Sequence, residues 1–160
     1  MEYIIREMEP AEYPLLNDFL YQAIFIPEGM QQPPYEIIFQ PELQVYTQNF
    51  GTSPHDRALA AAADGRIVGA VWVRIMHDYG HIDADTPSFA IALDPKYRGQ
   101  GIGTALMREM LETLRKAGYR QASLSVQKAN YAERMYRKLG FQIIGENDGE
   151  YLMRYLFRET

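Results

Sequence analysis

Cysteine is absent from the 160-residue sequence, which excludes disulfides, thiolate metal sites and a cysteine nucleophile together. Basic residues are also in deficit: 16 Lys and Arg stand against 21 Asp and Glu. The resulting net charge of −5 argues against a nucleic-acid partner, which needs a basic face. No apolar run approaches the roughly 20 residues that span a bilayer, and the charged start MEYIIREMEP is unlike a signal peptide. These absences predict a cytoplasmic protein with no membrane partner.

The sequence does contain enough apolar residues, 47% hydrophobic in all, for a single domain over residues 1–160. Apolar residues at three-and-four spacing predict helices, and short β-branched or small-residue runs predict strands, two of them joined by the hairpin signal Asp64-Gly65. The expected strands are 3–6, 57–63, 66–76, 88–93, 119–126, 141–144 and 151–157, and the expected helices are 10–25, 42–49, 102–118 and 131–139. This order indicates a mixed sheet with helices packed on it, in the α/β or α+β class.

The segment from Leu93 to Thr104, LDPKYRGQGIGT, is the most informative part of the chain. It enters a helix through Gly101 and Gly103, without the Ser or Asp cap that usually binds the first backbone N–H groups. Each glycine in helical geometry costs up to about 1 kcal/mol relative to alanine, and Arg98 lies at the positive end of the helix dipole. These features favour a phosphate or pyrophosphate cradle. A flexible connection, with glycines that only permit a tight turn, is the alternative.

Two stretches of the sequence match a known pattern, although the loop is neither a Walker A motif nor a dinucleotide fingerprint. Arg98-Gly99-Gln100-Gly101-Ile102-Gly103 matches R/Q-x-x-G-x-G/A and follows Pro95-Lys96-Tyr97. The run NYAERMYRKLGF, from Asn130 to Phe141, is similar to N-x-A-x-x-x-Y-x-x-x-G-F. Both resemble the Gcn5-related N-acetyltransferase (GNAT) family, most sharply between residues 88 and 141. The resemblance implies a mixed, mostly antiparallel central sheet of about seven strands flanked by about four helices.

The resemblance also implies acetyl-CoA as cofactor and acetyl donor, with its pyrophosphate on the backbone amides of residues 98–103. The strand residues 91–93 would then face the pantetheine and acetyl group. Their backbone would be partly unpaired from the next strand, so that a ligand amide can bond it. The cofactor-binding residues implied in this way are Ile91, Ala92, Leu93, Arg98, Gly99, Gln100, Gly101, Ile102, Gly103, Thr104, Asn130 and Tyr136.

Tyr136 occupies the position that protonates the departing thiolate in the family, so the resemblance implies that it is the catalytic residue. A phenol with a pKa of about 10 is a reasonable proton donor to a thiolate. With Ala132 and Met135 on an apolar helical face, the same ring is also explained as core packing. Asn130 has a similar double interpretation, because Asn followed three residues later by Glu133 resembles a capping box.

No motif marks the general base or the acceptor site. Asp83 and Asp85 precede the strand before the glycine loop, and Glu28 lies in a Pro-rich loop, so these acids are candidates near the acceptor. Glu28 and Asp85 are the expected substrate-binding residues, although solvated loop acids are the commoner explanation. Candidates for lining an amine pocket are Glu28, Tyr35, Phe39, Tyr46, Trp72 and Tyr79. His77 and His81 lack further ligands, and no metal is predicted.

The sequence therefore predicts an N-acetyltransferase in which an amine of a small molecule, peptide or protein attacks acetyl-CoA directly, since no cysteine is present for an acyl-enzyme. A non-catalytic acyl-CoA-binding or sensor domain, and transfer of another acyl group, are the alternatives. Acidic residues within 78–85 favour a cationic amine. The strand 151–157 alternates poorly, so a homodimer through one of its faces is a further expectation.

Overall fold

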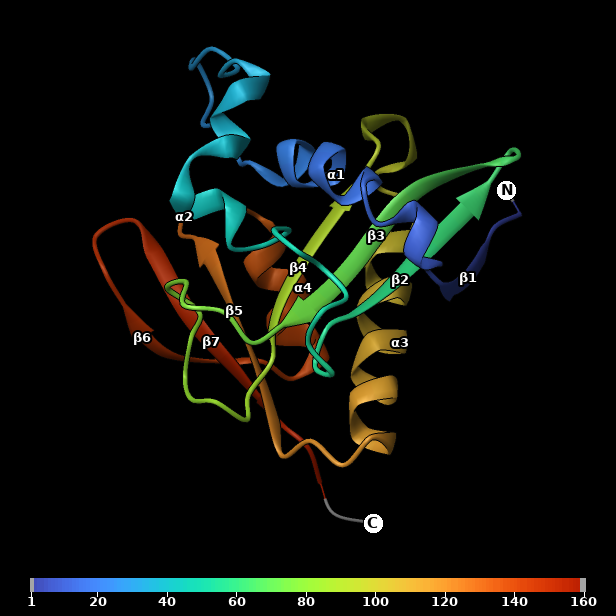
Figure 1. The fold of residues 1–160 in the computed structure, drawn as a ribbon. Coiled ribbons are helices and arrows are strands. Elements are labelled where there is room, and N and C mark those ends of the chain that lie inside the picture. Colours follow the sequence, from blue (N-terminus) through green and yellow to red (C-terminus); the bar gives the residue numbers. More distant parts are fainter. Residues whose placement is uncertain (1, 159–160) are drawn as a thin grey trace.

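The computed structural model describes residues 2–158, and their seven strands form one sheet in the order β1-β2-β3-β4-β5-β7-β6 (Figure 1). Every neighbouring pair is antiparallel except β4 and β5. The strands are β1 (Ile4–Glu7), β2 (Arg57–Ala63), β3 (Arg66–Arg74), β4 (Ser88–Leu93), β5 (Gln121–Gln127), β6 (Gln142–Glu146) and β7 (Glu150–Leu156). The helices are α1 (Leu15–Ala23), α2 (Pro41–Gln44), α3 (Ile102–Lys116) and α4 (Ala132–Leu139), with the 3₁₀ turns η1 (Pro10–Glu12), η2 (Tyr35–Phe39) and η3 (Pro95–Tyr97). The predicted fold class is confirmed.

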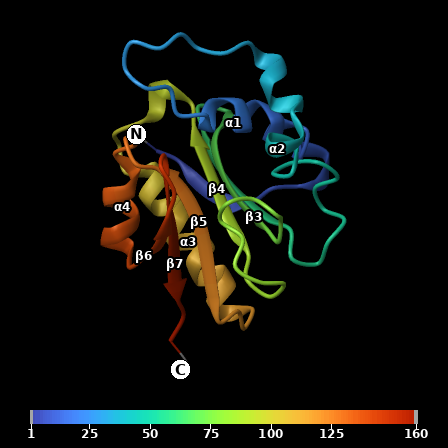
Figure 2. The ribbon, with the colours of Figure 1, turned by 90° about the vertical axis from the view of Figure 1, so that its left-hand side faces the viewer.

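Helices cover both faces of the sheet (Figure 2), because successive residues of a strand point to opposite sides. Val71 and Leu124 belong to the core under α3 and α4, whereas Trp72 belongs to the core under α1 and η2. The residues of β4 divide in the same way, with Phe89 in the first core and Ala92 in the second. Because both faces are buried, the inner strands read as nearly continuous apolar runs in the sequence.

The local elements follow the sequence signals closely, with two exceptions. The hairpin at Asp64-Gly65 is confirmed, and both residues have the positive φ (53° and 77°) that a two-residue turn between twisted strands requires. The helix predicted over 10–25 is instead the turn η1 followed by α1, because Pro14 suits a helix start and not a helix interior. The helix predicted over 42–49 ends at Gln44. None of the helices within residues 2–158 is long and apolar enough to cross a membrane.

The strands β4 and β5 diverge from a single point of contact. Within residues 2–158 their one pairing joins Ser88 to Ser123, where the Ser123 N–H donates to Pro87 O at 3.0 Å. Along its other edge β4 pairs with β3 over its whole length, and β5 pairs in the same way with β7. The facing edges of residues 89–93 and 124–127 therefore open into a wedge with unpaired backbone groups, as the resemblance implies.

Candidate active site

A cavity of about 710 Å³ fills the wedge between β4 and β5. Residues 89–93 and 124–127 form its two walls. From one face of the sheet α4 contributes Met135 and Tyr136, and from the other face α1 and the segment after it close the cavity. The volume lies within the range of small-molecule sites, and the passage through the sheet allows two ligands to meet from opposite faces.

Seven of the predicted site residues line this cavity, namely Ile91, Ala92, Leu93, Arg98, Gly103, Asn130 and Tyr136. Four more of the predicted site residues lie in the adjoining loop and first helical turn but outside the lining, namely Gly99, Gln100, Gly101 and Thr104. Ile102 is 1% exposed with its side chain in the core, so only its backbone is available to a ligand. Glu28 and Asp85 are both exposed and lie outside the lining, so the structure does not bring them to this cavity.

The N-terminus of α3 carries no side-chain cap. Its N-cap residue, Gly101, has a φ of 85°, and Gly99 in the preceding turn has a φ of 76°. Glycine suits these left-handed conformations, where a Cβ costs about 1–2 kcal/mol. The first helical bond runs from the Ala105 N–H to Gly101 O at 3.1 Å, so the N–H groups of residues 102–104 precede the hydrogen-bonded ladder. With Arg98 beside it, this helix end fits an anionic phosphate group.

Tyr136 belongs both to the core beneath α4 and to the cavity lining. It is 7% exposed, and its ring meets Phe141 edge-on with the centroids 6.1 Å apart. Burial raises the pKa of its hydroxyl to about 12, because the charged phenolate is poorly solvated there. The phenol therefore stays protonated throughout the neutral range, as a proton donor must.

Asn130 caps α4, although the reciprocal half of a capping box does not form. Its Oδ1 accepts a hydrogen bond from the Ala132 N–H at 2.9 Å, while Glu133 pairs with Arg137 along the helix. The Asn130 N–H donates instead to Gln127 O at 2.9 Å. The cap does not use the carboxamide nitrogen, and Asn130 also lines the cavity, so both interpretations of this residue fit the structure.

Asp83, one of the candidate acids, has a structural role in the loop between β3 and β4. Its carboxylate accepts hydrogen bonds from Thr86 Oγ1 at 2.7 Å and from the Asp85 N–H at 2.9 Å, and these bonds lower its pKa. Gln121 also reaches it at 3.3 Å, which places Asp83 at the end of β5 away from the cavity. The two histidines of this loop have no further metal ligand, since residues 2–158 contain no group of three or more side chains placed to hold a metal.

Comparison with known proteins agrees with this geometry. The acetyltransferase (GNAT) family matches residues 25–141. The chain belongs to this family. A GNAT relative, L-amino acid N-acetyltransferase AaaT of Escherichia coli (strain K12), is 24% identical over 163 residues, which cover 96% of this chain and 95% of that protein. The chain spans 56% or less of the length of several other curated relatives that it matches. The family match confirms the resemblance that the two motifs predict.

Solved GNAT structures share the fold over nearly the whole chain. PaiA N-acetyltransferase of Thermoplasma acidophilum, in complex with coenzyme A, has a TM-score of 0.72 at 18% identity and covers 98% of this chain and 100% of its own. The ribosomal-protein-S18-alanine N-acetyltransferase of Escherichia coli has a TM-score of 0.69 at 18% identity, with coverage of 99% and 96%. These likenesses confirm the predicted GNAT fold.

The GNAT cavity also contains residues that no motif marks. Tyr46, Ser125 and Glu150 line it, and of these only Tyr46 is among the candidates for an amine pocket. Trp72, another candidate, is fully buried in the core and donates its Nε1–H to Tyr46 O at 3.0 Å, so it holds the backbone of a lining residue in place. The other aromatic candidates lie outside the lining, namely Tyr35, Phe39 and Tyr79.

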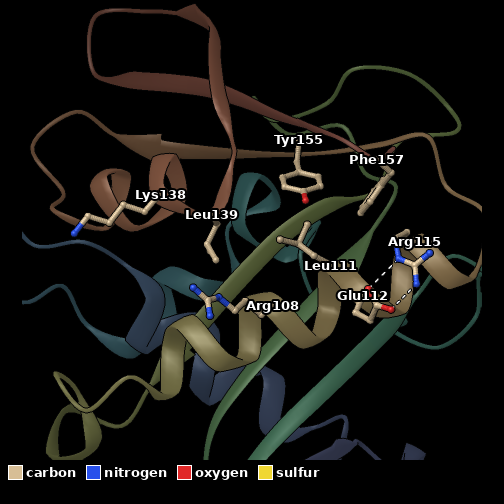
Figure 3. Close-up of a pocket in the computed structure, with 8 residues that line it drawn as sticks. All are labelled: Arg108, Leu111, Glu112, Arg115, Lys138, Leu139, Tyr155 and Phe157. Carbon is tan, nitrogen blue, oxygen red and sulfur yellow. Dashed lines mark hydrogen bonds and ion pairs between the residues drawn. The ribbon is translucent and has the colours of Figure 1, made fainter. Parts of the chain in front are cut away.

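A second, smaller cavity of about 210 Å³ in this GNAT protein lies between α3, α4 and β7 (Figure 3). Its described lining shares no residue with that of the first cavity. Figure 3 shows the rings of Tyr155 and Phe157 facing Leu111 of α3, with the ion pair of Glu112 and Arg115 at one end, 2.6 Å apart. This ion pair accounts for two of the charged residues in the lining, and Arg108 and Lys138 add two further cations.

Proposed function

We propose that the protein is an N-acetyltransferase that transfers the acetyl group of acetyl-CoA to a primary amine by direct attack of the amine. The observation that carries this proposal is the cavity in the β4–β5 wedge, which meets the uncapped N-terminus of α3 and is lined by residues from both faces of the sheet. Membership of the acetyltransferase family supports both the reaction and the donor.

The residues present fit the proposed donor. The N–H groups of residues 102–104 and the guanidinium of Arg98 would hold the pyrophosphate. The unpaired backbone of residues 91–93 would bond the pantetheine amides, and Asn130 would add a contact at the start of α4. When bound, acetyl-CoA supplies an acyl group that is activated as a thioester.

Tyr136 is the proposed proton donor to the leaving sulfur. Its hydroxyl belongs to a residue of the cavity lining, and with a pKa of about 12 it carries its proton at neutral pH. Within residues 2–158 no group accepts a hydrogen bond from this hydroxyl, so its proton is available to a ligand in the cavity.

The proposed acceptor is a primary amine of a small molecule, a peptide or a protein. Two of the similar proteins are named for such groups: AaaT for L-amino acids, and the S18 enzyme for the alanine of a ribosomal protein. In the present cavity, Glu150 and Tyr46 face the acceptor side, and a carboxylate there suits a cationic group.

The cytoplasmic location, the single domain and the homodimer stay predictions. The strand β7 pairs along one edge with β5 and along the other with β6. A second copy that contacted β7 would therefore have to use a face of the strand and not a hydrogen-bonding edge.

A thiol-release screen tests the proposed function. Because the chain contains no cysteine, every thiol detected comes from coenzyme A. The screen offers amino acids, polyamines, aminoglycosides and peptides with free N-termini, and we expect release with at least one primary amine and none with its N-acetylated form. Calorimetric binding of acetyl-CoA without release across the panel would support the non-catalytic sensor instead. Faster release from a longer acyl-CoA would indicate transfer of another acyl group.

A further inference from the structure

The cavity is divided by charge between its two ends. Among the described residues that line it, Glu150 is the one carboxylate and Arg98 is the one cation. Arg98 precedes the N-terminus of α3, where the phosphates of the donor are proposed to lie. Glu150 begins β7, where it pairs with Gln127 at the end of β5. A positively charged ligand group is therefore attracted toward Glu150.

Strand alternation places Glu150 on the face of the sheet opposite Tyr136. Val126 belongs to the core under α3 and α4, so residues 125 and 127 of β5 point to the other face, and Glu150 shares that face with its partner. Tyr46, which follows α2, lines the cavity from this side. The proposed acid and Glu150 thus approach the wedge from opposite faces, as a leaving sulfur and an attacking amine require.

A second carboxylate, Asp78, lies beside this face without lining the cavity. Its Oδ2 accepts hydrogen bonds from Tyr46 Oη at 3.0 Å and from Ser88 Oγ at 3.3 Å, whereas its Oδ1 is buried with no hydrogen-bond partner among the described residues. Close packing fixes this loop, since a Cβ on Gly80 would lie 2.7 Å from Ser88 Oγ. Burial raises the pKa of Asp78.

Asp78 also acts on Glu150 through space. Burial, and then the negative charge of Asp78, raise the pKa of Glu150 above its ordinary value. The same two causes raise the pKa of Tyr46, so this residue stays a neutral hydrogen-bond donor. The cation that follows β5, Lys128, is already paired with Glu146 at 2.7 Å. Glu150 is thus a carboxylate with a raised pKa that lines the end of the cavity away from Arg98.

We propose that Glu150 is the general base that takes a proton from the acceptor ammonium, and that Asp78, which accepts a hydrogen bond from Tyr46 on the same face of the sheet, is a positioning residue for this site. One N–H bond of the ammonium breaks and its electron pair stays on nitrogen. The proton forms an O–H bond on the Glu150 carboxylate and later leaves to water, while the neutral amine has the lone pair it needs for attack. The inference rests on the proposed function and narrows the acceptor to a primary amine that arrives as a cation.

Glu150→Gln removes the base and keeps the shape of the side chain. With the amine found by thiol release, we expect kcat/KM near neutral pH to fall about 100-fold or more, the acidic limb of its pH profile to disappear, and the affinity for acetyl-CoA to stay unchanged. Glu146→Gln, the same change outside the cavity, should alter neither kcat/KM nor the acidic limb of its pH profile. An acidic limb retained in Glu150→Gln overturns this inference. Absence of thiol release from the wild-type protein would overturn the proposed function itself.

The role of Asp78 has its own readout. Asp78→Asn should keep the acidic limb and move its midpoint to lower pH by roughly 0.5–1 unit, because one nearby negative charge is lost. Glu146→Gln, which removes a carboxylate outside the cavity, should leave the midpoint in place. In the absence of acetyl-CoA, NMR titration of ¹³C-labelled glutamate carboxyls, assigned by Glu150→Gln, should show Glu150 titrating above its ordinary range. A wild-type Glu150 that titrates at the ordinary value overturns the inference, whether or not Asp78→Asn folds.

Discussion

Exchange of Gly103 for alanine should separate the stability of the fold from the capacity to bind the donor. Gly103 lies in the first turn of α3, and a Cβ there would be 3.4 Å from Leu93 Cδ1 and 4.0 Å from Ile91 Cδ1, which is an ordinary contact. Alanine is up to about 1 kcal/mol more favourable than glycine in a helix. The free energy of unfolding should therefore rise by up to that amount, or roughly 2–4 °C in Tm for a chain of this size.

The added methyl group would stand on the cavity wall beside the N–H groups proposed to hold the phosphates. Because the motif R/Q-x-x-G-x-G/A accepts alanine at this position, Gly103→Ala should keep its affinity for coenzyme A. Gly103→Leu puts a larger side chain in the same place, where it should prevent one of the proposed hydrogen bonds. A hydrogen bond to a charged group contributes about 1.5–3 kcal/mol, so Gly103→Leu should bind coenzyme A and acetyl-CoA roughly 10- to 150-fold more weakly.

Urea denaturation measures the first effect and calorimetric titration measures the second. Gly101→Ala is the contrasting variant: nothing lies within 4 Å of its Cβ, yet its φ of 85° makes alanine cost about 1–2 kcal/mol. It should therefore destabilise the fold where Gly103→Ala does not. Unchanged affinity for coenzyme A in a folded Gly103→Leu protein would refute the placement of phosphates at this helix end.

Tyr136→Phe should lower kcat about 100-fold or more with little change in acetyl-CoA affinity. Tyr155→Phe, which lies outside this cavity, should leave kcat unchanged. Wild-type turnover in Tyr136→Phe would show that Tyr136 is not the acid. The Asp56 and Arg74 side chains that form an ion pair are only 1% and 10% exposed, respectively. Asp56→Ala should lower the free energy of unfolding in urea by about 3–5 kcal/mol, because it leaves the buried charge of Arg74 without its partner. Glu112→Ala, which breaks a surface ion pair, should change that free energy little. Folding raises the pKa of Tyr136 from about 10 to about 12, so its contribution to stability is complete below pH 10 and is lost as the pH rises through 12. Unfolding curves of Tyr136→Phe at alkaline pH should lack this loss of stability. A Tyr136→Phe curve identical to that of the wild-type protein would contradict the raised pKa of Tyr136.

Signals that depend on a few consecutive residues predicted much of the fold and the backbone conformation of the glycine loop. Asp64-Gly65 specified the hairpin because its turn needs two positive φ angles. The glycine loop specified an uncapped helix start in the same way, through Gly99 and Gly101. In each case neighbouring residues alone determine the backbone conformation, so a single sequence is sufficient to indicate it.

Residues whose environment depends on tertiary contacts were predicted less well. Asp83 is a candidate base because it shortly precedes β4, but its carboxylate accepts hydrogen bonds from Thr86 and from the backbone of its own loop. The apolar spacing of residues 10–25 does not reveal that Pro14 divides them into a turn and a helix. Spacing records which residues can share a face, whereas loop geometry decides which groups remain available for chemistry.

The proposed acceptor side is assembled from distant segments, and of its residues only Tyr46 is among the candidates that the sequence offers. Tyr46 follows α2, Asp78 lies between β3 and β4, and Glu150 begins β7. Tyr46 and Glu150 line one cavity because β4 and β5 diverge beyond Ser88, and Asp78 is joined to it through its hydrogen bond with Tyr46. Because β4 is as apolar as a strand paired on both edges, this divergence leaves no mark in the sequence. The proposed donor side, by contrast, would use backbone N–H groups of consecutive residues, which a motif can specify. Proteins that share the glycine loop can therefore differ in their acceptor, since the side chains that would choose it lie outside both motifs.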